Sequence, residues 1–246
     1  MCDPVRRTLG LLALGVLVLT AGCSALGPDE VSEDDLAESV EHDWNTTADA
    51  TFDLEKGGYR AVYRFENAES IELYRPRRLR NREPVDPRGL AFRYPNGTVV
   101  NLTTAHVKRS DGATVVTPPA ENGAIGFAAS RTGKRLLVPT EVEGSYEVVL
   151  PENGRVRYPF LGRVNPGADE RFPGDDGRTH LRWEGIDGDR LVVEYYLVRD
   201  LLILGGIVGI AILAVLAGGV YYVVVMRRLR ERREEVALDV DTTDHD

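Results

Sequence analysis

Residues 51–65 read TFDLEKGGYRAVYRF, and this stretch sets the expected fold class. In its second half every second residue from Tyr59 to Phe65 is apolar, and Arg60, Val62 and Arg64 lie between them. Side chains of a β-strand point alternately to its two faces, so this pattern predicts a strand with one buried face. The sequence Lys56-Gly57-Gly58 favours a turn. The stretch is therefore predicted to be a β-hairpin.

Short stretches of the same kind recur along the chain, between turns rich in Gly, Pro and Asn. Their ranges are 70–74, 90–94, 98–102, 114–117, 126–129, 135–138, 146–150, 179–183 and 190–198. The last two are joined by residues 185–189, Gly-Ile-Asp-Gly-Asp, which is a strong turn signal. Many short strands with frequent turns predict a mainly β domain, most simply a β-sandwich.

One short helix is expected before the first strand. Val31, Leu36, Val40 and Trp44 could share one helical face. Ser32 is a suitable N-cap, with an acidic residue three positions later. We therefore expect an amphipathic helix within residues 31–44.

Near the C-terminus, Leu201–Met226 contains 26 residues without a charge. As a helix this run would be about 39 Å long at 1.5 Å per residue. A membrane-spanning helix needs about 20 apolar residues, so the run predicts a transmembrane helix. Tyrosines lie near both of its ends, where amphipathic rings settle among lipid headgroups: Tyr195, Tyr196, Tyr221 and Tyr222.

Charge on either side of this run predicts its orientation. Five arginines follow the run directly: Arg227, Arg228, Arg230, Arg232 and Arg233. On the other side only Arg199 is close, next to Asp200. Basic residues favour the cytoplasmic side, so we expect a cell-membrane protein with residues 24–200 outside and the C-terminus in the cytoplasm.

The N-terminus resembles an export signal. Arg6-Arg7 precedes an apolar run from Leu9 to Gly22, which is too short for a comfortable membrane span and suits a signal peptide. The run ends Thr20-Ala21-Gly22-Cys23, which resembles a lipoprotein signal with Cys23 as the lipid attachment site. The alternative is an uncleaved anchor helix with a free Cys23 thiol. Both alternatives export the same segment.

These signals divide the chain into five parts. We expect a signal peptide (1–22), a lipid-anchored linker (23–30), a β-rich extracytoplasmic domain (31–200), a transmembrane helix (201–226) and a cytoplasmic tail (227–246). Anchors at both ends of the domain would hold it close to the outer face of the membrane.

Composition excludes several classes of protein. The 246 residues carry a net charge of −9, which argues against nucleic acid as a partner. Two cysteines are too few for a disulfide scaffold or a four-cysteine zinc site. Of the 30 basic residues 27 are arginines, and the lysines are Lys56, Lys108 and Lys134. An acidic chain poor in lysine suits very salty water, and a GC-rich genome would also explain the arginines.

Two groups of exported residues could be modified or could bind a ligand. Asn45, Asn96 and Asn101 begin sequences of the Asn-X-Thr type and are candidate N-glycosylation sites. The segment 74–82 is dense in arginines that could contact an anion: Arg75, Arg77, Arg78, Arg80 and Arg82. The alternative for this segment is a solvated loop balanced by the acidic surface.

Small residues in the apolar run could pack against a second helix. Gly205 and Gly209 form a Gly-x-x-x-Gly pair, and Ala214 and Gly218 repeat the spacing. Such faces let membrane helices approach closely. They suggest a homodimer, although glycine is common in membrane helices in any case.

Motifs for chemistry are weak. His42, His106 and His180 show no spacing typical of metal ligands. The segments Asp175-Asp176 and Asp187-Gly188-Asp189 resemble turns of an acidic protein more than calcium loops. No nucleophile elbow or phosphate loop occurs. We therefore predict no catalytic residue, no metal and no cofactor, and the sequence favours a protein that is not an enzyme.

The lipobox-like residues 20–23, the acidic composition and the single C-terminal anchor resemble haloarchaeal surface lipoproteins. Residues 158–167 and 195–200 resemble, more narrowly, an uncharacterised haloarchaeal membrane-protein family. The resemblance implies a surface lipoprotein that binds a partner or supports the envelope. Expected partners are membrane lipid, another membrane or envelope protein, or a second copy. The alternatives are an accessory factor for membrane or exported proteins, and a hydrolase whose active site no motif marks.

Overall fold

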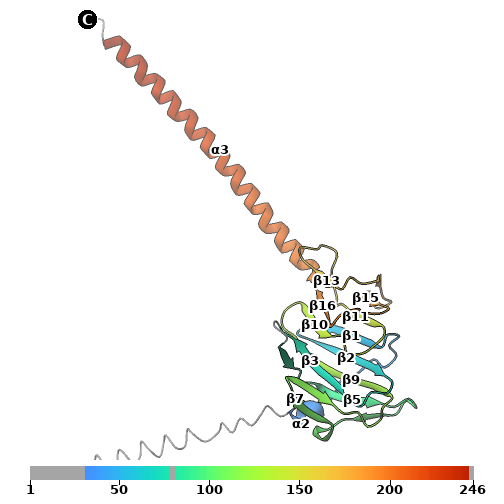
Figure 1. Ribbon diagram of the computed structural model, residues 1–246. Coiled ribbons are helices and arrows are strands. Elements are labelled where there is room, and N and C mark those ends of the chain that lie inside the picture. The colour runs from blue at the N-terminus through green and yellow to red at the C-terminus, as the bar shows by residue number, and fades with distance from the viewer. Residues whose placement is uncertain (1–30, 78–80, 244–246) are drawn as a thin grey trace, which may run out of the picture.

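The computed structural model describes residues 31–77 and 81–243, with side chains as far as Arg230. Figure 1 shows a β-rich body from which one long helix extends. The described strands lie between Ala50 and Leu197, and the long helix follows them directly. The predicted mainly β class with one apolar C-terminal helix is confirmed.

The largest sheet has eight strands. Its spatial order is β14 (Glu170–Pro173), β15 (Thr179–Trp183), β11 (Tyr146–Val149), β1 (Ala50–Glu55), β2 (Gly58–Phe65), β9 (Gly123–Ser130), β5 (Arg88–Arg93) and β6 (Val99–Asn101). All neighbours in it are antiparallel except β1 and β11, which are parallel. The predicted hairpin forms the centre of this sheet: β1 and β2 pair from Ala50–Tyr63 to Glu55–Gly58.

Three smaller sheets complete the domain. One contains β4 (Arg82–Pro84), β3 (Ile71–Pro76), β8 (Ala113–Val116) and β7 (Val107–Ser110), and another contains β10 (Arg135–Pro139), β16 (Arg190–Glu194) and β13 (Arg163–Asn165). The third pairs β12 (Gly154–Arg155) with β17 (Tyr196–Leu197). A single turn of 3-10 helix, η2 (Thr104–His106), precedes β7.

One core joins the sheets. Trp183, Tyr146, Phe52, Phe92 and Phe127 from the large sheet are fully buried. They belong to the same apolar cluster as residues of the smaller sheets: Ile71, Leu73, Val116, Leu136, Val138, Leu191 and Val193. In strands such as β1 and β15, alternate residues face this core and an outer face, as in a β-sandwich.

The N-terminal helix is shorter than predicted. Helix α2 (Glu33–Leu36) is a single turn, and the Ser32 hydroxyl accepts a hydrogen bond from the Asp35 amide at 3.4 Å, as a cap does. Beyond it the chain crosses the outer face of the large sheet. There a side chain on Gly126 would clash with the rings of His42 and Trp44. Packing on the sheet overrides the helical pattern of residues 37–44.

Strands form in both predicted ranges, 179–183 and 190–198, but these strands do not pair with one another. β15 pairs with β11 and β14, whereas β16 pairs with β10 and β13. The turn at residues 185–189 thus carries the chain from one sheet to another. Each strand buries its apolar face because each lies in a different sheet, which a local pattern does not reveal.

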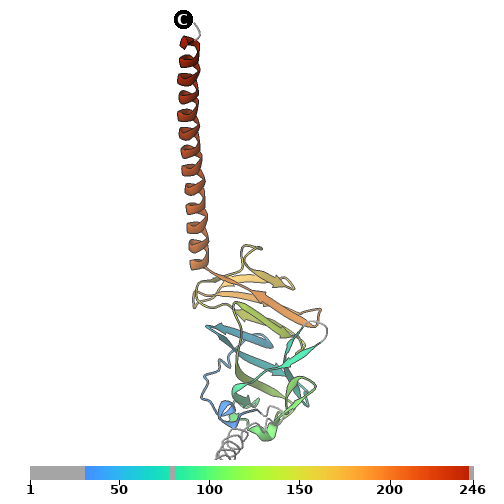
Figure 2. The ribbon, with the colours of Figure 1, turned by 90° about the vertical axis from the view of Figure 1, so that its left-hand side faces the viewer.

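The C-terminal helix α3 runs from Val198 to Thr243. Its segment Val198–Arg230 is long and apolar enough to cross a membrane and contains the predicted span 201–226. Its most apolar window has no buried residue. Figures 1 and 2 show α3 and α2 at opposite ends of the β domain.

Candidate functional site

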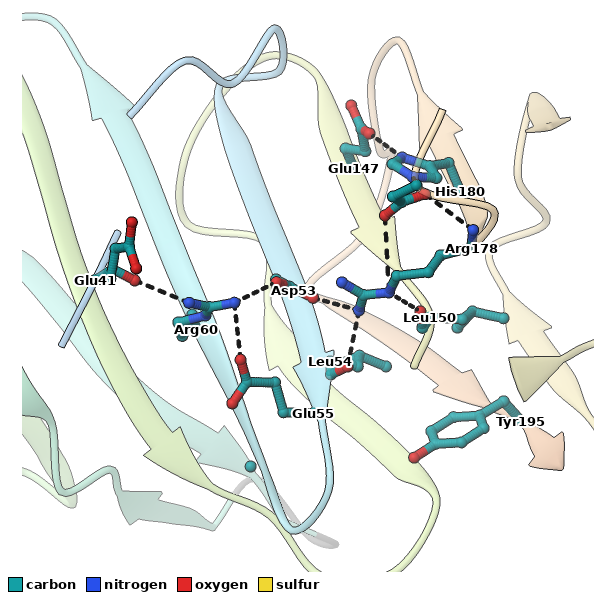
Figure 3. A network of polar contacts seen from close by, with 12 residues as sticks. Glu41, Asp53, Leu54, Glu55, Arg60, Glu147, Leu150, Arg178, His180 and Tyr195 are labelled. Carbon is teal, nitrogen blue, oxygen red and sulfur yellow. Dashed lines mark hydrogen bonds and ion pairs between the residues drawn. The ribbon is translucent and has the colours of Figure 1, made fainter. Parts of the chain in front are cut away.

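A polar network covers the outer face of the large sheet (Figure 3). Asp53 of β1 is its centre, because its two carboxylate oxygens accept from Arg60 at 2.9 Å and from Arg178. Arg60 also pairs with Glu55 at 2.8 Å. Arg178 donates further to the carbonyls of Leu54 at 3.0 Å and Leu150 at 2.7 Å. We call these residues, together with His180 and its partners below, the outer-face network.

His180 is held between two carboxylates. Its Nδ1 lies 2.7 Å from Glu147 Oε1 and its Nε2 lies 3.2 Å from Asp176 Oδ1. Burial raises the pKa of Asp176, but hydrogen bonds from the Arg178 amide and from His180 outweigh it and lower that pKa below its ordinary value. Both ring nitrogens of His180 are occupied, so the ring has no free nitrogen to act as a general base.

A groove of about 860 Å³ lies beside the β3–β4 hairpin, β10 and β16. Five arginines line this arginine groove: Arg75, Arg77, Arg131, Arg135 and Arg190. Three of them pair with carboxylates, namely Arg77 with Glu83, Arg135 with Glu194 at 3.2 Å, and Arg190 with Asp189 at 3.1 Å. Most of its positive charge is therefore neutralised within the domain.

The predicted arginine run is split by the fold. Arg75 and Arg77 reach the arginine groove, where burial raises the pKa of Tyr59 to about 12. Arg82 instead pairs with Glu72 at 2.5 Å and lies over the ring of Tyr74, 4.3 Å from its centroid. Arg78 and Arg80 lie outside the described residues. Anion contact by this run stays a prediction.

A second pocket, of about 600 Å³, lies where the domain meets α3, and we call it the junction pocket. Its walls are the β1–β2 turn, the loop from β9 to β10, the turn after β11 and the start of α3. Five of its lining residues are cations: Lys56, Arg131, Lys134, Arg178 and Arg199. Its lining carboxylates are Glu55 and Glu152. The pocket also has apolar walls, from Leu54, Pro151 and Leu197.

The start of α3 is fastened to the domain. Asp200 Oδ2 accepts from Lys134 Nζ at 2.5 Å and from the Leu197 amide at 2.8 Å. The Val198 amide donates to the Asn153 carbonyl at 3.2 Å. Since β17 ends at Leu197 and α3 begins at Val198, no linker separates the sheet from the helix.

The structure bears on the remaining predicted sites to different degrees. Asn45, Asn96 and Asn101 are all exposed, and glycosylation stays a prediction. Cys23 and the signal peptide lie outside the described residues. Among the residues that the structure describes, no group of three or more His, Cys, Asp or Glu side chains is arranged to hold a metal ion.

The small residues of α3 fall on two faces. A side chain built on Gly205, Gly209 or Gly218 would meet nothing within 4 Å. At about 100° per residue the pair 205/209 and the pair 214/218 lie roughly 180° apart around the helix. One helix partner could therefore use only one of the pairs, and dimerisation stays a prediction.

Sequence reasoning missed the junction pocket. Lys56 and Lys134 are far apart in the chain, and each taken alone is an ordinary turn residue. A signal was present nonetheless, because two of the three lysines in the chain line this one pocket.

Comparison with known proteins gives a family without an activity. No curated protein matches the chain. A model of a family of unknown function, DUF5803, matches residues 46–241, which includes the strands and most of α3. The chain therefore belongs to this family of unknown function, DUF5803.

Proposed function

We propose that this protein is a single-span membrane protein that holds a β-rich binding domain against the outer face of the cell membrane. The junction between β17 and α3 carries this proposal. A domain joined to its membrane helix without a linker, and clamped by Asp200, cannot swing far from the bilayer. Its function is then exercised at the membrane surface.

Charge supports the orientation. The uncharged run 201–226 is followed by Arg227, Arg228 and Arg230. On its other side Arg199 is close, and it neighbours Asp200. Excess arginine belongs on the cytoplasmic side. The export signal predicted within residues 1–22 favours the same topology.

A binding role fits the polar groups better than catalysis does. His180 is locked between Glu147 and Asp176, and His42 is buried with its Nε2 bonded to the Gly89 carbonyl at 2.8 Å. In the arginine groove Arg75 donates to the Ser130 carbonyl and pairs with no carboxylate of the described residues, so its guanidinium can match a carboxylate or phosphate of a partner. A hydrolase remains the weaker alternative, and an accessory role for other membrane proteins is compatible with the same placement.

A lipid on Cys23 would restrict the domain further. Residues 23–30 reach at most about 29 Å when fully extended. A domain of this size is about 40 Å across, and α2 lies at the end away from α3 (Figure 2). Both anchors could then enter one leaflet only if the domain lies on its side along the membrane. In that case Cys23→Ala should lower energy transfer from a label at Asn45→Cys to a dye in the bilayer.

Topology can be tested by labelling intact cells. In a Cys2→Ser/Cys23→Ala background, an impermeant maleimide should label Asn96→Cys without lysis and Arg228→Cys only after lysis. The reverse pattern would refute the proposed orientation. Capture of partners from native membranes at high salt, with and without Arg75→Ala in the arginine groove, would then separate a binding protein from a purely structural one.

A further inference from the structure

The junction pocket holds positive charge that the domain does not neutralise. Arg131 donates only to neutral groups: the Gly58 carbonyl at 3.0 Å, the Glu55 carbonyl at 2.6 Å, the Gly133 carbonyl and the Tyr195 hydroxyl. Its guanidinium also lies 5.1 Å from the Tyr195 ring centroid. These contacts fix the position of the Arg131 charge without cancelling it.

Of two further cations in the pocket, one is unpaired and the other is only weakly paired. Lys56 is exposed and forms no ion pair with any described residue. Arg199 is 73% exposed and its nearest carboxylate is its neighbour Asp200 at 4.0 Å. Of the lining carboxylates, Glu55 already pairs with Arg60, which leaves Glu152. The pocket therefore has a net positive charge.

The pocket also lies at a defined depth. Tyr195, Leu197 and Arg199 line it, and the uncharged run begins at Leu201. At 1.5 Å per helical residue, Arg199 lies about 3 Å along the axis from the start of that run. Lipid headgroups occupy a layer of several ångströms just outside the hydrocarbon. Arg199 and the cations that line the same pocket thus lie near headgroup level, and Pro151 and Leu197 add apolar surface beside them.

Given the proposed function, which places this end of the domain at the bilayer, we propose that the junction pocket binds the phosphate of an anionic lipid in the outer leaflet. Lys56 and Arg199 hold the phosphate oxygens, and Arg131 supplies a fixed charge behind them. An ammonium on a flexible stem suits a phosphate whose depth fluctuates, and Lys56 supplies such a group at the mouth of the pocket. The acyl chains then lie along the first apolar turns of α3.

The test is lipid selectivity of the full-length protein reconstituted in phosphatidylcholine vesicles. Trace spin-labelled phosphatidylglycerol or phosphatidylcholine reports the fraction of lipid immobilised by the protein. The double variant Lys56→Gln/Arg199→Gln should lower the preference for phosphatidylglycerol by roughly fivefold. Lys108→Gln removes the remaining lysine, on β7, and should leave the preference unchanged. The smaller preference that remains after this fall is expected from the arginines beyond the apolar run.

Three results would overturn the proposal. The double variant could retain the full preference of the unchanged protein, or Lys108→Gln could lose as much. Excess inorganic phosphate could abolish the difference between the protein and its double variant, which would assign the pocket to a soluble phosphate. None of these results alters the labelling pattern that tests topology, so failure of this proposal and failure of the proposed function are distinguishable.

Discussion

The outer-face network and the junction pocket contain the same kinds of charged residue, but the charges have different roles. In the network each arginine pairs with a carboxylate, since Arg60 and Arg178 share Asp53, and the ring of His180 lies between Glu147 and Asp176. In the junction pocket Lys56 and Arg131 face none among the described residues. Charges that are satisfied internally fasten strands together, whereas uncompensated charges beside a cavity are available to a ligand.

Removing the centre of the network should have the largest effect. Asp53→Ala leaves two arginines without their shared carboxylate, so we expect a loss of about 2–3 kcal/mol in the free energy of unfolding. In a thermal unfolding experiment on the full-length protein in detergent this corresponds to a fall in Tm of roughly 6–10 °C. Asp189→Ala is the matched control. Asp189 is 81% exposed in its pair with Arg190, and its loss should change stability by less than about 0.5 kcal/mol. Equal effects of the two variants would show that the network is ordinary surface charge.

His42 offers a third case, a buried polar side chain that lines neither the arginine groove nor the junction pocket. Its Nε2 must carry the proton that the Gly89 carbonyl accepts, and its buried Nδ1 has no hydrogen-bond partner in the described chain. Burial, and to a lesser degree the charge of Arg60, lower the pKa of His42, against a smaller opposing effect of the Gly89 carbonyl. The unfolded chain then binds the proton more readily than the folded protein does.

The sign of the pH effect follows. As pH falls below about 6.5, the ordinary pKa of histidine, protons favour the unfolded chain and stability declines until pH passes the folded pKa. The slope for one proton is at most about 1.4 kcal/mol per pH unit. Tm measured from pH 8 to pH 5 should therefore fall less in His42→Gln than in the unchanged protein. Parallel curves would contradict this account.

The clamp at the start of α3 should contribute less to stability. Asp200→Ala removes the acceptor for Lys134 and for the Leu197 amide. Because Asp200 is partly exposed, we expect the free energy of unfolding to fall by only about 1 kcal/mol. Its main effect should be on motion. A spin label at Arg135→Cys on β10 should show a broader distribution of distances to a second label on α3. An unchanged distribution would show that β17 alone holds the junction rigid.

The sequence predicts what is local and misses what is distant. Alternation along residues 59–65 predicts β2 because neighbouring residues alone determine which face a side chain occupies. The contact between Asp53 and Arg178 joins residues 125 positions apart, and no spacing rule indicates it. The turn at 185–189 suggests a hairpin because its residues favour reversal, yet the partners of β15 and β16 are fixed by the core. The short polar strands β4, β7, β12, β13 and β14 carry too little pattern to be predicted.

The same limit explains the candidate sites. The arginines at 75–82 attract attention as a run, but the fold sends Arg75 and Arg77 to a groove and Arg82 to Glu72 and Tyr74. The junction pocket is assembled from three turns and a helix start, so its cations are scattered along the sequence. Only the scarcity of lysine in the sequence points to this pocket, because Lys56 and Lys134 both line it.

The last comparison is between two faces of α3, one with Gly205 and Gly209 and the other with Ala214 and Gly218. If Gly205 and Gly209 form a helix–helix contact, Gly205→Leu/Gly209→Leu should weaken dimerisation by roughly threefold in native membranes, because bulky side chains keep the backbones apart. Ala214→Leu/Gly218→Leu makes the same change on the opposite face and should have no effect on that dimer. Cross-linking yields of the two variants at matched expression measure the difference. Monomer in the unchanged protein, or equal loss in both variants, would contradict a contact through Gly205 and Gly209 and would leave α3 as an anchor for a single copy of the β-rich domain.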